Sequence, residues 1–291
     1  MRRVLRWVRH VLVAFVLLLL AATAAVYALS ERALRRTSAE PLVSIAVPTD
    51  SGSIAEGGRL ALIHGCRGCH APDLSGHVWE DDFLIGEINA PSLTLAAQKY
   101  TDDELARIIR RGVRPDGRTV WGMPSEMFAP LSDADVGRII AYLRSVTPVG
   151  GLPQRIKPGP LARLGIVTGE YLPATTWVAQ ADSITAAGYY PAAGEPNALG
   201  AYLARTACPE CHNLALQGYP GDTPDLSIAA GYSPAQFAHF FATGEALGGR
   251  ELGLMSQVAR SRFSNFTDEE EAALYAYLVA RAGAAQGGTA K

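Results

Sequence analysis

The stretches CRGCH, residues 66–70, and CPECH, residues 208–212, place two cysteines and a histidine at the same spacing in each half of the chain. Together they use all four cysteines of the 291 residues. A structural zinc site has its cysteine pairs roughly 15 to 20 residues apart, whereas these pairs lie about 140 residues apart. A thioredoxin-like thiol pair follows a strand and opens a helix, but here helical pattern precedes the motif and loop-like sequence follows. Both alternatives fit poorly.

The spacing instead suits covalent attachment of haem c. Two thiols separated by two residues can add to the two vinyl groups, and the histidine directly behind them is delivered to the iron. We therefore expect two covalently bound haem c groups. The expected attachment residues are Cys66, Cys69 and His70 in the first motif and Cys208, Cys211 and His212 in the second.

Composition and charge limit the remaining possibilities. The length suggests one to two domains, and 48% apolar residues are enough for packed cores. A net charge of −2 gives no indication of nucleic-acid binding.

The amino terminus has the pattern of a membrane helix. Four arginines within residues 1–10 precede an uncharged run over residues 11–29. As a helix, roughly 19 residues span about 28 Å, close to the hydrocarbon thickness of a bilayer. We expect a single-pass anchor in a bacterial inner membrane with the haem domains in the periplasm, where c-type haem is attached. The alternative is a cleaved signal peptide, with residues 26–28 as the small-residue site.

The two motifs belong to an internal repeat. The segment LSDADVGRIIAYL, residues 131–143, corresponds to FTDEEEAALYAYL, residues 266–278. Other matched positions are Gly58 with Gly200, Pro91 with Pro224, Tyr100 with Tyr232, Gly112 with Gly244, and Met123 with Met255. The chain therefore contains two copies of one haem-binding unit.

Each copy is predicted to be helical. Thr101 and Ser233 are expected to cap a middle helix that Gly112 or Gly244 ends. Ser132 is expected to cap the last helix of the first copy, and Thr267 with Glu270 to form a capping box in the second. Each copy has only about 90 to 95 residues, so haem would supply much of its apolar core.

This order of features resembles the class I cytochrome c domain, present twice. The closer similarity is to membrane-anchored dihaem c-type cytochromes, including the cytochrome subunits of periplasmic quinoprotein dehydrogenases, and it covers residues 57–280 apart from the middle linker. The fold class that the resemblance implies is all-α, with two tandem class I cytochrome c domains behind a single N-terminal transmembrane helix.

The resemblance also implies the second iron ligand. The family places a methionine shortly before the terminal helix, which corresponds to Met123 and Met255, so the expected metal ligands are His70 with Met123 and His212 with Met255. Met127 remains a rival for Met123, because a methionine four residues away can equally fill core space. Pro91 and Pro224 lie where the family's loop offers a backbone carbonyl to the non-ligating nitrogen of the histidine.

Several other residues have two open interpretations. His10, His64, His77 and His239 could in principle replace a methionine, and His64 is expected to face outward or toward the haem edge. The run Arg110, Arg111, Arg114 and Arg118 could pair with haem propionates or form a solvated helix end.

The expected domains are a membrane anchor (1–36), a tether (37–56), cytochrome domain 1 (57–148), an interdomain linker (149–198), cytochrome domain 2 (199–283) and a flexible tail (284–291). The tether should let the body stand off the membrane. The expected function is single-electron transfer between a membrane or periplasmic donor and an acceptor, without catalysis. The partners expected are a dehydrogenase, a quinol-oxidising complex or a terminal oxidase, and the lipid bilayer. The alternative is a dihaem peroxidase-like enzyme with one open haem site, which two matched methionines disfavour.

Overall fold

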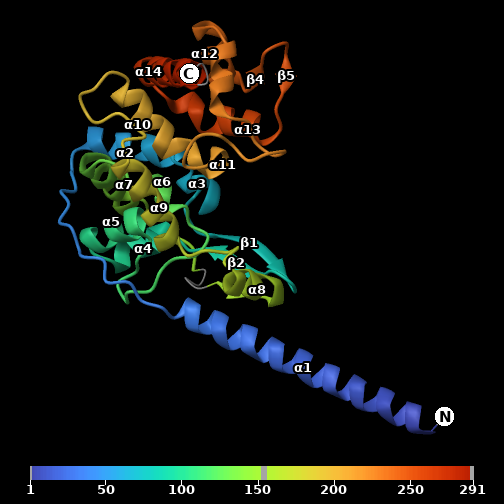
Figure 1. Cartoon of the computed structure of the whole chain (residues 1–291). Coiled ribbons are helices and arrows are strands. Elements are labelled where there is room, and N and C mark those ends of the chain that lie inside the picture. Colours follow the sequence, from blue (N-terminus) through green and yellow to red (C-terminus); the bar gives the residue numbers. More distant parts are fainter. Residues whose placement is uncertain (1, 152–155, 289–291) are drawn as a thin grey trace.

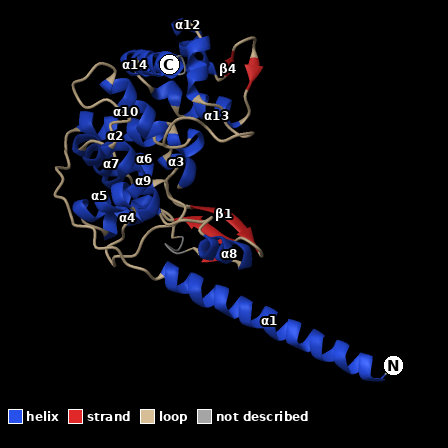
Figure 2. Ribbon diagram, in the orientation of Figure 1, coloured by secondary structure: helices blue, strands red, loops and turns tan. Residues whose placement is uncertain are grey.

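The computed structural model describes residues 2–151 and 156–288, and it is dominated by helices (Figures 1 and 2). The first helix, α1 (Arg2–Leu34), projects away from the rest of the molecule (Figure 1). Within the described residues it is the one helix long and apolar enough to cross a membrane.

The remaining helices form two units and a linker. Those of the first unit are α2 (Ser51–Ile63), α3 (Cys66–Cys69), α4 (Leu93–Lys99), α5 (Asp102–Arg111), α6 (Ser125–Phe128) and α7 (Asp133–Ser145). The linker contains α8 (Pro160–Thr168) and α9 (Ala174–Ala186). The second unit contains α10 (Ala198–Ala207), α11 (Pro209–His212), η1 (Leu226–Gly231), α12 (Pro234–Thr243), α13 (Leu254–Ser261), η2 (Phe263–Asn265) and α14 (Asp268–Gly288). The predominantly helical fold class is confirmed.

Both units are built on the same helix crossing. In the first, α2 packs on α7 so closely that a Cβ at Gly57 would overlap the carbonyl oxygen of Arg138. In the second, α10 packs on α14, and a Cβ at Gly200 would overlap the carbonyl oxygen of Ala273. Glycine is needed at both points because the two backbones touch. Gly57, rather than the neighbouring Gly58, therefore performs in the first unit the packing role of Gly200.

The predicted helix caps are present. The Thr101 and Ser132 side chains accept hydrogen bonds from backbone N–H groups three residues further on, and Gly112 ends α5 in the left-handed conformation. In the second unit, Ser233 caps α12 and Thr267 forms the expected capping box with Glu270. Each cap satisfies N–H groups that a helix start leaves without a partner.

The structure also contains strands that the sequence did not predict. The hairpin of β1 (His77–Asp82) and β2 (Gly86–Ala90) is antiparallel and is extended by β3 (Lys157–Pro158) from the linker. A second, two-stranded pair joins β4 (Glu245–Ala246) to β5 (Arg250–Glu251). Both sheets are peripheral to the helical cores (Figure 2).

Residues 37–50 differ from the expected free tether. They form an extended strap on the first unit, in which Ser38 N donates to Gly117 O (2.8 Å) and Ile45 N to the Asp103 carboxylate (3.1 Å). Ile45 and Val47 pack against the core of that unit. These residues therefore do not form a free tether, because their apolar side chains cover part of the core of the first unit. The strap also ends earlier than expected, since α2 begins at Ser51.

The linker and the carboxyl terminus contain more helix than expected. The expected interdomain linker contains two helices, α8 and α9, which the sequence analysis did not predict. α14 continues to Gly288, beyond the expected start of a flexible tail at residue 284. The last part of that expected tail, residues 289–291, lies outside the described residues.

Candidate functional site

The first CxxCH motif forms a single helical turn. Gly65 adopts the left-handed conformation (φ 75°) and starts α3, and the backbone N–H of His70 donates to Cys66 O (2.9 Å). Residues three apart on a helix lie on the same face. The turn therefore presents the thiols of Cys66 and Cys69 together, with His70 directly behind them.

The imidazole of His70 is fixed by one hydrogen bond. Its Nδ1 lies 2.7 Å from the carbonyl oxygen of Pro91, which can only accept, so the ring proton is on Nδ1 and Nε2 keeps a free lone pair. Burial lowers the pKa of His70 and keeps the ring neutral. A neutral imidazole with a free Nε2 is the form that binds a metal.

The second motif repeats this geometry. α11 forms the corresponding turn, and His212 Nδ1 donates to the carbonyl oxygen of Pro224 (2.8 Å). Burial lowers the pKa of His212 as well. Thr223 adds a hydrogen bond from its hydroxyl to Cys211 O (2.5 Å), which ties the motif to the loop that carries Pro224.

The thiols do not have the properties of a redox or zinc site. All four cysteines are free of disulfides, and burial raises the pKa of Cys66 and of Cys208 to about 12. Thiols with such a pKa are protonated near neutral pH, unlike nucleophilic thiolates. Over residues 2–151 and 156–288, no three His, Cys, Asp or Glu side chains gather as a metal site. Paired free thiols beside a neutral histidine do fit haem c.

The methionines differ in their packing. Met123 lies just before α6 and is half-buried against the core of the first unit, whereas Met127 on α6 is fully buried inside that core. Met255 lies in the first turn of α13 and is half-buried against the core of the second unit. Met123 and Met255 thus share a position beside a core, and Met127 has the packing of a core residue.

The two units meet through equivalent residues. His64 and Thr206 each lie two positions before the first cysteine of their motif, and His64 Nδ1 lies 3.0 Å from Thr206 O. His64 is buried there, so the expectation that it faces outward was wrong. Contact between equivalent positions is a property of a two-fold interface.

Reciprocal contacts flank this point. On one side, α2 contacts η2, and the guanidinium of Arg59 donates to the carboxylate of Glu270 (2.7 and 2.8 Å) in the first turn of α14. On the other side, α10 contacts α6, and the hydroxyl of Tyr202 donates to Asp135 Oδ2 (2.6 Å) in the first turn of α7. Each unit therefore uses the helix before its own motif to hold the last helix of the other.

Arg262 connects the two motifs directly. Its guanidinium lies against the backbone of the first motif, where a Cβ at Gly65 would overlap it. The same guanidinium donates to the carboxylate of Glu210 (2.8 Å), which lies inside the second motif. One arginine thus sets a positive charge between α3 and α11, which lie next to each other in Figure 1.

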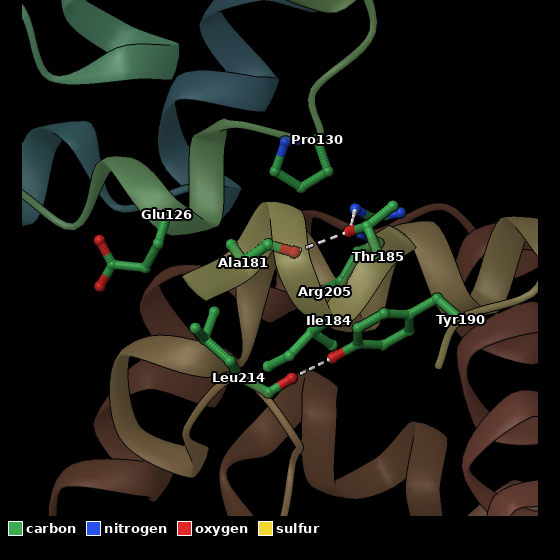
Figure 3. Close-up of a pocket in the computed structure, with 8 residues that line it drawn as sticks. All are labelled: Glu126, Pro130, Ala181, Ile184, Thr185, Tyr190, Arg205 and Leu214. Atoms are coloured by element: carbon green, nitrogen blue, oxygen red, sulfur yellow. Dashed lines mark hydrogen bonds between the residues drawn. The ribbon is translucent and has the colours of Figure 1, made fainter. Parts of the chain in front are cut away.

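The linker helix α9 closes one side of the interface. Figure 3 shows a small pocket bordered by residues of α6, α9 and the second unit. Around it, Arg205 donates to Thr185 Oγ1 (2.6 Å) and the Tyr190 hydroxyl donates to Leu214 O (2.5 Å). α9 also contacts α5 and α6 of the first unit. The linker is therefore part of the body.

Sequence reasoning missed Arg262, Glu210 and the interface role of His64. Glu210 stands inside CPECH and could have been noticed, but Arg262 lies about 50 residues later and only the fold reveals it. Of the four arginines singled out earlier, Arg110 pairs with Asp133 and Arg111 with Asp182, which favours the interpretation as a charged helix end.

Comparison with known proteins supports the interpretation of the first motif. Residues 53–143 match the family described as cytochrome c oxidase, cbb3-type, subunit III. The fructose dehydrogenase cytochrome subunit of Gluconobacter japonicus is 31% identical over 107 residues, which are 33% of this chain and 22% of that protein. The cytochrome c subunit of a quinone alcohol dehydrogenase from Gluconobacter oxydans (strain 621H) is 32% identical over 110 residues, or 34% and 23%.

The aligned part is thus less than a quarter of the length of either relative. Both relatives are named as cytochrome subunits of dehydrogenases, which favours electron transfer over the peroxidase-like alternative. Together with the paired thiols and neutral histidines, these similarities show that the matched part of the chain is that of a c-type cytochrome.

Proposed function

We propose that this c-type cytochrome carries two covalently bound haem c groups and passes single electrons along a bacterial inner membrane, with its two units in the periplasm. The observation that carries the proposal is the duplicated geometry: each unit holds paired thiols and a buried histidine fixed on a proline carbonyl. The proposed attachment residues are Cys66, Cys69, Cys208 and Cys211, and the proposed iron ligands are His70, Met123, His212 and Met255.

The protein's part in electron transfer is to hold its ligands still. Haem c supplies a one-electron iron couple when bound. The Pro91 and Pro224 carbonyls keep each histidine in one tautomer and one orientation, so that neither proton nor ring has to move when the charge changes. A thioether from Met123 or Met255 suits the reduced metal and favours a high reduction potential.

The reciprocal interface supports transfer between the two units. Arg262 touches one motif and pairs with the other, and His64 and Thr206 meet just before each pair of thiols. The two motifs are therefore joined by a shared arginine and lie close together. An electron could enter at one unit and leave from the other.

We further propose that α1 remains as a single-pass anchor and that the chain works as the cytochrome subunit of a dehydrogenase or oxidase complex. The apolar length of α1 and the names of the relatives support this. The donor would be the redox centre of a dehydrogenase or a quinol, and the acceptor another cytochrome or a terminal oxidase.

The haem content can be measured directly. Protein produced with the haem c attachment machinery should have an intact mass that exceeds the polypeptide mass by two haems, and a haemochrome assay should give the same ratio. The double variant Cys208→Ser/Cys211→Ser should retain one covalent haem, as should Cys66→Ser/Cys69→Ser. A wild-type mass with a single haem would contradict the proposal of two.

The partner can be sought in native membranes. Extraction in mild detergent should yield the cytochrome together with a dehydrogenase or oxidase subunit, and addition of that enzyme's substrate should reduce both haems. Reduction that requires a soluble shuttle would argue against a fixed complex.

A further inference from the structure

Five exposed apolar side chains gather beside the end of α1 that would leave the proposed membrane. They are Phe83 and Leu84 at the tip of the β1–β2 hairpin and Leu161, Leu164 and Val167 on α8. Phe83 is 82% exposed, more than any other large apolar side chain in the described residues. We call these five residues the hairpin–α8 face.

Hydrogen bonds join the two parts of this face. The backbone N–H of Leu161 donates to Leu84 O (2.8 Å), and that of Gly159 donates to Ile85 O (2.7 Å). The hairpin tip itself is held by Asp82, whose carboxylate accepts from the N–H groups of Leu84 and Ile85 (2.7 and 2.9 Å). The exposed side chains are therefore carried by segments that hydrogen bonds hold in place, not by a loosely held loop.

Contacts between α8 and the end of α1 fix the position of the face along the axis of α1. Arg163 on α8 donates to Ser30 Oγ (2.9 Å), and its guanidinium lies over the ring of Tyr27 at 4.7 Å. One turn further along α8, Ile166 shares a small core with Leu34. Because these contacts use one side of α8, Leu161 and Leu164 are left on another side, without cover.

The contacts of α8 fall at the level where α1 should leave the hydrocarbon. Trp7, just before the uncharged run of α1, and Tyr27, near the end of that run, are both exposed. They are about 20 residues apart, or about 30 Å along a helix, which matches the hydrocarbon thickness and the usual position of interfacial aromatic residues. Residues beyond Tyr27 then lie in the headgroup layer, and α8 lies beside them (Figure 1).

We propose that the hairpin–α8 face is a second membrane contact, which inserts into the headgroup region of the leaflet from which α1 emerges. We expect the face to contact lipids of the same bilayer that α1 spans. α8 packs on the end of α1 that leaves the hydrocarbon, and the face therefore lies beside α1 at the membrane surface. The proposal rests on the proposed anchoring role of α1.

The charges around the face indicate what kind of lipid it takes. Two basic side chains beside the face are already paired: Lys157 with Glu87 at 2.6 Å, and Arg163 with Glu31 at 3.5 Å. Exposed Glu80 and Asp81 on β1 add negative charge to the rim. Binding should therefore depend on apolar insertion, require no anionic lipid and change little with salt.

Photo-crosslinking from defined positions tests the proposal. The full-length holoprotein would be reconstituted in phosphatidylcholine vesicles with a benzophenone amino acid at one position: 83, 161, 16 within α1, or 228. Ile228 is the matched control, since it is 57% exposed and lies on η1 of the second unit. Lipid adducts would be detected by the mass of the intact protein after illumination.

We expect lipid adducts at positions 83 and 161 in yields similar to position 16 and several-fold above position 228, with little change when salt is raised. Adducts at 16 but not at 83 or 161 would overturn this inference and leave the anchor intact. Adducts from 83 or 161 to a second protein chain would also overturn it. Absence of adducts at 16 would refute the anchor, and this inference with it.

Discussion

His64 lies buried between the two units, where a positive charge on its ring would be destabilised by the loss of water. Burial lowers the pKa of His64 to about 4 from its ordinary 6.5. In the unfolded chain, His64 therefore takes up a proton as the pH falls below 6.5, whereas in the folded protein it stays neutral down to about pH 4. The free energy of unfolding therefore decreases as the pH falls from 6.5 to 4. The loss should reach about 3 kcal/mol at the acid end.

The measurement is denaturant unfolding of the holoprotein at pH 7 and at pH 4.5. His64→Gln should flatten the pH dependence relative to wild type, whereas His77→Gln, at an exposed position on β1, should leave it unchanged. Equal slopes for His64→Gln and wild type would show that His64 is not the responsible group.

The two methionines of the first unit allow a clean contrast. Met123→Ala should remove the weak long-wavelength absorption band of a methionine-ligated ferric haem from one unit and lower that haem's reduction potential. Met127→Ala should keep the band but destabilise the protein by about 2–5 kcal/mol, because Met127 fills the core. The reverse pattern of spectra would assign the ligand to Met127.

The contacts of residues within one haem-binding unit could be predicted from the sequence. Contacts between residues of different units could not. The hydrogen bonds from His70 to Pro91 and from His212 to Pro224 lie where the resemblance to class I cytochrome c implied them. The contact of Arg262 with Gly65 joins residues from different units, and no local pattern carries that information.

At the scale of elements, helix starts are held by side-chain caps. Ser132 Oγ accepts from Asp135 N (3.1 Å) at the start of α7. Ser132→Ala should therefore lower the free energy of unfolding by about 1 kcal/mol, with thermal unfolding as the measurement. Ser145→Ala at the exposed other end of the same helix is the control and should have a much smaller effect. Equal losses would indicate that the cap is not stabilising.

The elements that the sequence predicted are those with local signals. α5, α7, α12 and α14 all have a capping residue followed by apolar residues at helical spacing. β1 has no buried residue on either side, and the hairpin is further held by β3 and α8 from about 70 residues away. α9 buries only three side chains, all small or β-branched, which gave a weak apolar pattern.

At the scale of the whole molecule, the arginine between the motifs should influence both haems of the proposed pair. A nearby positive charge favours the less positive, reduced iron, so Arg262→Gln should lower both midpoint potentials. Glu210→Gln removes the compensating negative charge and should raise them. Redox titration followed optically measures both shifts.

The exposed ion pair of Arg260 with Glu251 provides the comparison, and Arg260→Gln should change the potentials less than Arg262→Gln does. A shift in only one haem would mean that Arg262 acts within a single unit. Shifts of equal size for Arg260→Gln and Arg262→Gln would mean that only net charge matters.

The strap over residues 37–50 has a consequence for how quickly electrons can be exchanged. Released, about 14 residues could reach up to roughly 50 Å and would let the haem units search a wide volume for partners. In the structure these residues are packed on the first unit, so closely that a Cβ at Gly137 would overlap Ala46 O. They therefore do not let the haem units move away from α1. For the membrane-anchored form that we propose, the height of the redox centres above the bilayer would then be constant. Encounters would depend on lateral diffusion and on the density of partners in the membrane, and only a partner with its own centre at the same height could exchange electrons rapidly.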